Sequence, residues 1–372
     1  MYRVARKSAD LLRMSLVTSA AMLLAICLLA LVETTNTAEA KDSLPENGKI
    51  AFESFPPPAR SGKIYTVEPD GSNVRQLIPV DGTPKWSPDG TELLLDSSTG
   101  TAVMSADGSN MRIISNATLD EDDPTWPEGV YPTWSADGTR VAWSNTRLDL
   151  EKGESSDNDI FMVNLDNLNQ TNLRKTPKFD ETYAAFSPDG SQVCFTNLNI
   201  YIPGSKPSGI YVMDVNRSEP TLLFEDDTPG TCDWSPDGKK IVFDSNNEYP
   251  KARKAEVYII NADGSGLTKL TSNSAADTRP AWSPDGTKIV FSSDRDGGNL
   301  DLYTMDTDGS DVAQLTNLPG GAYTPDWQPL TPKSRSMTVR QPDTGGPSLL
   351  WVASALLFSG GTLLYAGLRR SM

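Results

Sequence analysis

The sequence of 372 residues contains no histidine. Histidine is the usual general base of hydrolases and supplies the imidazole ligand of many metal sites. Its absence excludes Ser-His-Asp catalysis, Cys-His catalysis and imidazole metal sites. Cysteine is scarce as well: Cys27 lies in an apolar run, and Cys194 and Cys232 alone cannot form a thiolate zinc site. No Gly-x-Ser-x-Gly nucleophile elbow occurs. We therefore expect a protein that is not an enzyme.

Positive charge is also in short supply. The chain has 33 Lys and Arg against 49 Asp and Glu, which gives a formal net charge of −16. An acidic surface repels a phosphate backbone and gains nothing from counterion release, so nucleic acid is excluded as a partner.

Residues 1–40 are typical of a secretory signal peptide. A basic start precedes an apolar run from Met14 to Val32, and Ala38-Glu39-Ala40 follows as a small-x-small cleavage site that depends on Ala38 and Ala40. The alternative is an uncleaved membrane anchor, because the run is long for a signal peptide. Both interpretations place the body outside the cytoplasm.

The other end carries a second apolar segment. The segment 347–367 has the ~20 residues that a membrane-spanning helix needs. Arg369 and Arg370 follow it, and these positive charges predict that the C-terminal tip lies in the cytoplasm. The preceding order of Pro-x-Thr-Gly, apolar span and basic tip resembles the LPXTG-like cell-wall sorting signal of Gram-positive surface proteins. The segment consists of Gln341, Pro342, Asp343, Thr344 and Gly345.

The resemblance implies that sortase cleaves between Thr344 and Gly345 and joins Thr344 to peptidoglycan. Pro342, Thr344 and Gly345 match the motif, whereas Gln341 stands where the family usually has Leu. The alternative is a plain single-pass membrane anchor with the body outside. Either way, we expect the protein on the extracellular face of the cell envelope.

Between the two ends, one phrase recurs. An aromatic residue followed by Ser-Pro-Asp-Gly, or by Ser-Ala-Asp-Gly in one copy, begins at Trp86, Trp134, Phe186, Trp234 and Trp282, with a degenerate copy at Trp327. The intervals are 48, 52, 48, 48 and 45 residues. The aromatic residue ends an innermost strand, and three runs follow it in each period: a short apolar run, a β-branched and aromatic run, and a weaker last run. Each period therefore predicts four strands.

A period of this length with four strands is typical of a β-propeller blade. Three strands near Ile50, Ile64 and Val74 precede the first aromatic phrase, and the strand at Trp327 follows the last complete blade. We therefore expect an all-β fold, a six-bladed β-propeller of four-stranded blades, with the C-terminal strand joining the N-terminal blade.

The repeated (Trp/Phe)-Ser-Pro-Asp-Gly and Tyr-x-Met-(Asp/Asn)-x-Asp-Gly-Ser phrases resemble the TolB-type propeller repeat. The expected organisation is a signal peptide (1–40), a linker (41–48), a TolB-like propeller (49–328), a polar stalk (329–340) and the sorting signal with its transmembrane helix (341–372). We expect each Asp-Gly to form the turn after the innermost strand, and each aromatic residue to pack between blades.

Candidate sites are few. Acidic loops at 294–299, 157–159 and 120–123 could hold structural calcium, but none has calcium-hand spacing, so we expect no cofactor. We expect Cys194 and Cys232 to be buried thiols, with a disulfide between adjacent blades as the alternative. The long loops 115–131, which contains Trp126, and 144–159 are the candidates for recognition.

The resulting hypothesis is a non-catalytic surface protein that binds a protein, a peptide or a cell-wall glycan. The alternatives are a carboxylate-based lyase or glycoside hydrolase in the propeller channel, and a structural envelope factor.

Overall fold

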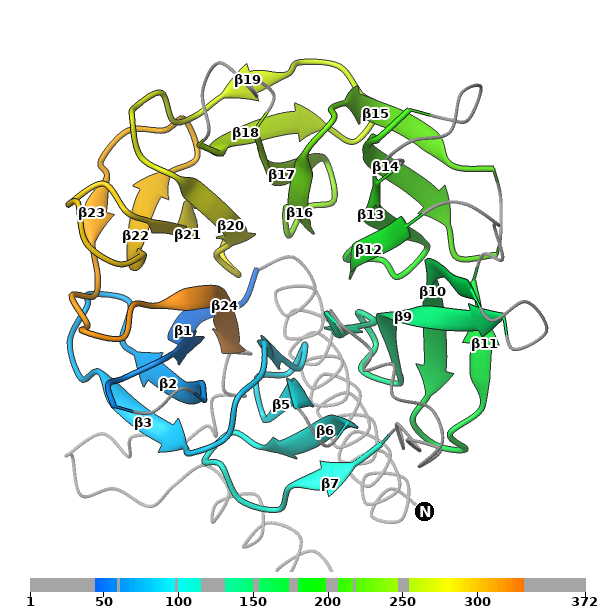
Figure 1. Cartoon of the computed structure of the whole chain (residues 1–372), viewed down its shortest axis with the longest axis horizontal. Coiled ribbons are helices and arrows are strands. Elements are labelled where there is room, and N and C mark those ends of the chain that lie inside the picture. The colour runs from blue at the N-terminus through cyan, green and yellow to red at the C-terminus, as the bar shows by residue number, and fades with distance from the viewer. Residues whose placement is uncertain are drawn as a thin grey trace, which may run out of the picture. The chain divides into compact units, whose positions relative to one another are not determined.

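The computed structural model describes residues 44–58, 61–97, 100–114, 131–149, 154–173, 180–198, 207–216, 219–246 and 254–330. These residues form six antiparallel sheets of four strands each, arranged in a ring (Figure 1). The prediction of an all-β, six-bladed β-propeller is confirmed. Within the described ranges, no helix has the length and apolar character of a membrane span.

Blades 2 to 6 each take four consecutive strands, which run from the channel outward in chain order. Blade 2 contains β4 (Pro84–Trp86), β5 (Glu92–Ser97), β6 (Gly100–Ser105) and β7 (Arg112–Ile113). Blade 3 contains β8 (Thr133–Trp134), β9 (Arg140–Asp149), β10 (Glu154–Asn164) and β11 (Gln170–Asn172). Blade 4 contains β12 (Asp180–Phe186), β13 (Gln192–Leu198), β14 (Gly209–Asp214) and β15 (Thr221–Glu225).

The last two of these blades follow the same order. Blade 5 contains β16 (Pro229–Trp234), β17 (Lys240–Ser245), β18 (Glu256–Asn261) and β19 (Thr268–Lys269). Blade 6 contains β20 (Asp277–Trp282), β21 (Lys288–Ser293), β22 (Asp301–Asp306) and β23 (Ala313–Gln314).

Blade 1 is built from both ends of the body. Its sheet order is β24 (Tyr323–Leu330), β1 (Glu46–Ser54), β2 (Lys63–Val67) and β3 (Arg75–Ile78). In the β1–β24 pairing, Ile50 lies opposite Trp327 and Glu46 lies opposite Leu330. The predicted closure of the ring is therefore confirmed. The two strands also reach into segments 41–48 and 329–340, which we expected to be linker and stalk.

The Asp-Gly turns have the predicted geometry. In blade 5, Asp237 Oδ1 accepts hydrogen bonds from Ser235 Oγ at 2.7 Å and from Lys239 N at 3.1 Å, and Gly238 has φ of +69°. The turn at Asp137 repeats this arrangement, and the hydrogen bond from its serine hydroxyl is the main reason that the pKa of Asp137 falls to about 2. These carboxylates stabilise turns and are not available as a separate site.

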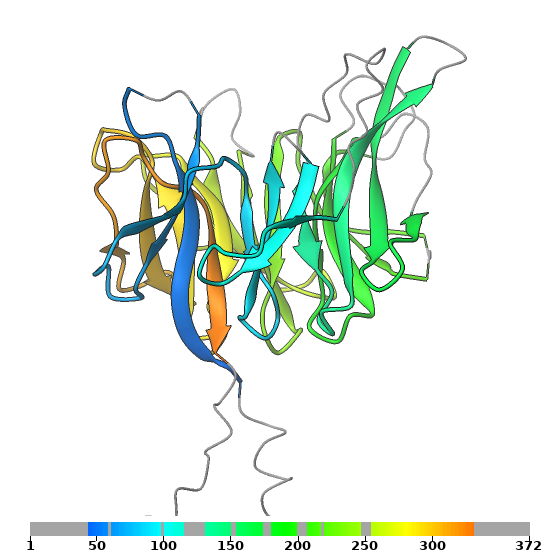
Figure 2. The same cartoon turned by 90° about the horizontal axis from the view of Figure 1, so that it is seen from below.

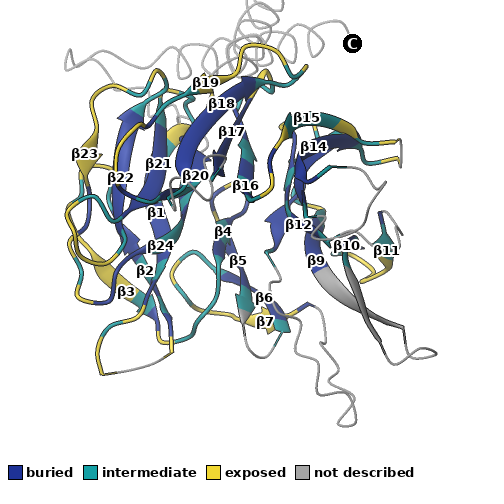
Figure 3. Ribbon diagram, turned by 45° about the horizontal axis from the view of Figure 1, so that its top comes forward, coloured by how far each residue is buried: buried dark blue, intermediate teal, exposed yellow. Residues whose placement is uncertain are grey.

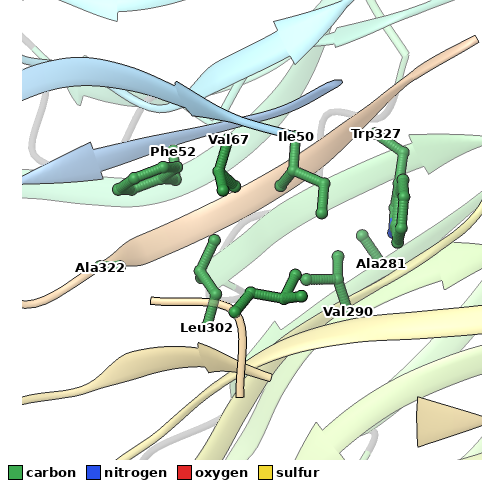
Figure 4. Close-up of a cluster of buried hydrophobic side chains, with 9 residues drawn as sticks. Ile50, Phe52, Val67, Ala281, Val290, Leu302, Ala322 and Trp327 are labelled. Carbon is green, nitrogen blue, oxygen red and sulfur yellow. The ribbon is translucent and has the colours of Figure 1, made fainter. Parts of the chain in front are cut away.

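The recurring aromatic residues lie in the core, as predicted. Trp86, Trp134, Trp234, Trp282 and Trp327 are all at most 7% exposed. Figure 4 shows such a contact between blades 6 and 1, where Trp327 packs with Ile50, Ala281 and Val290. In Figure 3, exposed residues gather on the outer strands and turns, while the inner strands are buried.

The ring has two different faces. The innermost strands begin on one face, here called the entrance face, and end in the Ser-Pro-Asp-Gly turns on the other, here called the turn face. β24 runs toward the turn face beside β1, so the start of β1 and the end of β24 leave together from that face (Figure 2).

One expected loop is mostly strand. Of residues 144–159, Ser144–Asp149 belong to β9 and Glu154–Asp159 belong to β10, and the two strands pair with Asp149 opposite Glu154. This hairpin projects beyond its neighbours on the entrance face (Figure 2). Its polar sequence resembled a loop because neither of its faces needs an apolar pattern once it extends past the core.

Candidate functional site

A pocket lies in the channel where the innermost strands begin. Every blade contributes the residue that stands three positions before its recurring aromatic residue, and these six residues are called the entrance ring. The entrance ring consists of Thr83, Tyr131, Tyr183, Thr231, Arg279 and Thr324. The repeat therefore brings together six side chains that are distant in sequence and places them around one axis.

The pocket wall behind the entrance ring is largely apolar. Four of the six blades supply a proline at the following position, namely Pro84, Pro132, Pro280 and Pro325, and the other two supply Ala184 and Cys232. The pocket has a volume of about 60 Å³. This is room for several water molecules or a small chemical group, but not for a folded surface.

Three members of the entrance ring have a left-handed backbone. Tyr183, Arg279 and Thr324 have φ of 56°, 55° and 51°, a conformation that costs about 1–3 kcal/mol for a residue with a side chain. Each lies at a β-bulge, where the register of pairing with the neighbouring strand shifts. Bulges of this kind redirect side chains at the rim of a barrel or beside a site.

Two buried aspartates fix the backbone of the entrance ring. Asp96 Oδ1 accepts hydrogen bonds from Thr83 N and from Thr83 Oγ1, the latter at 2.5 Å. Asp244 Oδ1 accepts from Thr231 N at 2.9 Å, from Thr231 Oγ1 at 2.8 Å and from Arg279 N at 3.1 Å. Asp244 therefore links blades 5 and 6.

These acids have raised pKa values. Burial raises the pKa of Asp96 to about 7, although its hydrogen bonds from Thr83 act in the opposite direction. Burial also raises the pKa of Asp244 and of Glu53, which accepts a hydrogen bond from Gly82 N at 3.1 Å. None of the three carboxylates lines the pocket itself; they support its wall.

An ionic cluster lies two residues farther along the innermost strands. Lys85 Nζ lies 2.8 Å from Asp326 Oδ1, and Asp326 Oδ2 accepts a hydrogen bond from Trp86 N at 2.7 Å. Burial alone would lower the pKa of Lys85, but the negative charges of Asp326 and Asp233 outweigh it and raise that pKa. Burial raises the pKa of Asp233 to about 6, with Lys85 opposing the shift.

The side chain of Arg279 differs from that of Lys85. Arg279 lines the pocket, and its guanidinium makes no hydrogen bond or ion pair within the described part of the chain. Elsewhere in blade 6, Arg295 Nη2 lies 3.0 Å from Asp277 Oδ1, and its guanidinium stacks over Tyr303 at 4.7 Å. Arg279 is therefore a cation held in a pocket without a partner of its own.

Two tyrosines of the entrance ring form a pair. The ring centroids of Tyr131 and Tyr183 lie 4.1 Å apart with planes tilted by 39°, and their hydroxyl oxygens are 3.4 Å apart. Burial and the neighbouring Tyr131 raise the pKa of Tyr183. The two rings present an aromatic surface on one side of the pocket.

The prediction of two buried thiols was wrong. Cys194 and Cys232 are both buried, but they form a disulfide with Cα atoms 6.4 Å apart. Cys194 lies in β13 of blade 4, and Cys232 lies in β16 of blade 5 and lines the pocket. The two strands face each other across the boundary between the blades. The position of each cysteine within its own repeat does not show that the two sulfur atoms meet.

The other predicted sites fall largely outside the described residues. Ala38, Ala40 and the sorting signal from Gln341 to Gly345 lie there, as do the transmembrane helix 347–367, the acids at 120–123 and the loop at Trp126. Among the residues that are described, no group of three acidic or cysteine side chains could hold a metal ion. Asp294 is instead paired with Lys254 at 2.9 Å.

Sequence reasoning missed the entrance ring. It examined the residues that follow each aromatic residue, where the repeat is regular, and not the three that precede it, where the blades differ. The available signal was a variable polar or aromatic residue followed in four blades by proline. Aligning the repeats on Trp86 and its equivalents places these residues at one level of the channel.

Comparison with known proteins agrees with this architecture. Residues 205–345, which include strands β14 to β24, match the TolB beta propeller domain family, PD40. The expected resemblance to the TolB-type propeller repeat is supported over this part of the chain.

Solved structures show the same fold at low identity. TolB from Acinetobacter baumannii is 20% identical with a TM-score of 0.63, over 77% of this chain and 68% of that chain. A protein described as TolB from Agrobacterium tumefaciens is 24% identical with a TM-score of 0.53, over 75% and 91%. A chain of the nidogen–laminin complex is 12% identical with a TM-score of 0.56, over 75% and 98%. Identities this low establish the propeller and nothing about its ligand.

Proposed function

We propose that this chain is a non-catalytic binding protein on the outer face of the cell envelope, and that its ligand enters the channel from the entrance face. The observation that carries this proposal is the entrance ring. All six blades converge on one pocket, and strained backbone at Tyr183, Arg279 and Thr324 is retained there. Strain of this kind concentrates at functional sites.

The position of the chain ends supports the orientation. The start of β1 and the end of β24 leave together from the turn face, opposite the entrance ring (Figure 2). A chain that continues after Leu330 therefore starts on the face opposite the entrance ring and leaves that ring free for a ligand. Ligands of the proposed class are a protein, a peptide or a cell-wall glycan.

The binding role can be tested by site-specific crosslinking in intact cells. A photoreactive amino acid replaces Tyr131 on the entrance face, and in a matched chain it replaces Ser109, which lies in an exposed turn on the turn face. Crosslinked species are identified by mass spectrometry. The proposal expects a distinct product from position 131 and not from position 109, whereas products from position 109 alone would contradict it.

The anchoring is tested separately, by digesting purified cell wall with muramidase and sequencing the C-terminal peptide of the protein. Sortase processing at the expected signal gives a peptide that ends at Thr344 and carries a muropeptide. A tail that is intact through Arg370 in the membrane fraction would leave the single-pass anchor as the correct alternative.

A carboxylate-based lyase or glycoside hydrolase is the second candidate. The observation in its favour is the pKa of Asp96, which is raised to about 7 near a second acid, Glu53. Against it, Asp96 Oδ1 accepts both hydrogen bonds from Thr83 and does not line the pocket. Cleavage of wall glycan or an acidic polysaccharide that is lost in both Asp96→Asn and Glu53→Gln would establish this candidate and refute the binding proposal.

A further inference from the structure

The ligand chemistry of the entrance pocket can be read from its charged side chains, and this inference rests on the proposed function. Two cations line the pocket, and Lys85 is already paired with Asp326 at 2.8 Å. Arg279 has no such partner within the described ranges. Arg279 interacts with Glu53 and Asp244 only at longer range, so an anionic group of a ligand in direct contact would complete the site.

The backbone of Arg279 is held independently of any ligand. Its N–H donates to Asp244 Oδ1 at 3.1 Å, and its φ of 55° at a bulge directs the side chain away from the regular strand pattern. The starting point of the side chain is therefore fixed before binding. Its planar fork of donors fits a carboxylate with two parallel hydrogen bonds.

The surrounding charge favours a group with one negative charge. Glu53 and Asp244 are close enough for the charge of Arg279 to act on both of their pKa values, and the whole chain has a net charge of −16. A phosphate or a polyanion would be repelled by this field. A single carboxylate gains the bonds to Arg279 with less repulsion.

The apolar wall of the entrance pocket favours a peptide over a sugar, and its threonine hydroxyls add no donor for an anion. Thr83 Oγ1 donates to Asp96, Thr231 Oγ1 donates to Asp244, and Thr324 Oγ1 donates to Tyr323 O. These three hydroxyls donate within the protein, so they have no donor left for a carboxylate of the ligand. The remaining wall consists of prolines and the tyrosine pair, which suits an apolar side chain.

We infer that the entrance pocket binds the free carboxyl terminus of a peptide or protein chain, with the terminal carboxylate on Arg279 and an apolar last side chain against Tyr131, Tyr183 and the prolines. The pocket lies where the innermost strands begin, so the end of a chain that enters along the channel axis reaches it first. The rest of the partner would lie above the pocket on the entrance face.

The test compares two pools of short random peptides, labelled with fluorescein at the amino end. One pool has free carboxyl ends and the other has amidated ends. Binding to the full-length chain is followed by fluorescence anisotropy. The native chain should bind the free-acid pool about 10- to 100-fold more tightly, because charge-assisted hydrogen bonds contribute about 1.5–3 kcal/mol.

Variants assign this preference to one side chain. Arg279→Gln should reduce it to about twofold or less, and Arg279→Lys should retain part of it, because a lysine keeps the charge without the fork. Arg75→Gln is the matched control, since Arg75 is exposed on the outer strand of blade 1, and it should leave the preference unchanged. A urea denaturation curve for each variant separates loss of binding from loss of fold.

The outcomes also separate the inference from the proposed function. Equal binding of both pools that is weakened by Tyr183→Ala would overturn the carboxylate inference and leave the entrance as a binding site. Binding of a uronate-containing oligosaccharide but of neither peptide pool would identify a glycan ligand and overturn the peptide assignment. Absence of all binding, together with absence of crosslinks from position 131, would refute both proposals.

Discussion

Lys85 and Asp326 are separated by 241 positions in the sequence, yet Lys85 Nζ lies 2.8 Å from Asp326 Oδ1 inside the channel. The same carboxylate accepts a hydrogen bond from Trp86 N. One acid therefore joins the last strand of the body to the innermost strand of blade 2. Asp233 does the same between blades 5 and 6 by accepting from Trp282 N at 2.8 Å.

Replacing Lys85 by Met should lower the free energy of unfolding by about 1–3 kcal/mol. The side chain of Lys85 is 34% exposed, but that of Asp326 is only 16% exposed, and both Asp326 and Asp233 lose their counterion. The control is Lys49→Met. Lys49 lies 3.8 Å from Glu68 in a pair with about a third of each side chain exposed, and its loss should cost less than about 1 kcal/mol. Urea denaturation measures both; equal losses would contradict the role given to the channel pair.

Asp96→Asn should make the protein more stable above neutral pH. The pKa of Asp96 is raised from 3.8 to about 7, so its contribution to stability is present below about pH 4 and is lost as the pH rises through 7. Asn retains an acceptor for Thr83 and removes the buried charge. We expect the variant to exceed the native chain by about 1–3 kcal/mol at pH 8 and to match it near pH 4.

Asp107→Asn is the control for this pH dependence. Asp107 is exposed in an outer turn, and hydrogen bonds from Ser109 lower its pKa. Its contribution is present above its ordinary pKa and is lost as the pH falls, so this variant should be the less stable one at pH 8. Urea midpoints measured between pH 4 and pH 8 give the stability change of each variant relative to the native chain. If both variants change stability in the same direction at pH 8, the role given to the raised pKa of Asp96 is refuted.

Removing the disulfide should destabilise the boundary between blades 4 and 5. Cys194 and Cys232 are 38 positions apart, and closing a loop of this size contributes about 2–4 kcal/mol. Reductant should lower the urea midpoint of the native chain and leave the Cys194→Ala/Cys232→Ala variant unchanged. Alkylation of both residues in the unreduced, unfolded chain would show that the bond is absent.

Gly238→Ala should cost about 1–2 kcal/mol through backbone conformation alone. Gly238 has φ of +69°, and a Cβ there would meet nothing closer than Pro188 Cδ at 3.7 Å. Gly298→Ala is the control, because that position has no such φ and no atom within 4 Å. Thermal unfolding distinguishes the two, and a difference close to zero would mean that the turn adapts to alanine.

The sequence predicted the architecture because a propeller is specified locally and repeatedly. The aromatic residue, the Asp-Gly turn and the alternating apolar runs recur in each blade, so one correct interpretation applies to all of them. The closure by β24 followed from counting strands that had no blade of their own. These features need only short-range information.

The candidate site could not be predicted in the same way. Arg279, Tyr183 and Thr231 each stand in a different repeat, and their proximity depends on the ring diameter and on bulges that shift the register by one residue. The Cys194–Cys232 bond was only the alternative prediction for a related reason, because it depends on how two blades face each other. Properties that arise between repeats are set by the assembled ring.

The position of β24 in blade 1 also fixes the order in which folding can finish. Blades 2 to 6 can form from neighbouring strands as soon as each has emerged, but blade 1 keeps an open edge along β1 until Tyr323–Leu330 become available. The pairing of Glu46 with Leu330 is a contact of very long sequence separation, which makes it a late step. A chain that stops short of this strand therefore leaves the inner edge of β1 unpaired, so the ring closes only when the body has been synthesised completely.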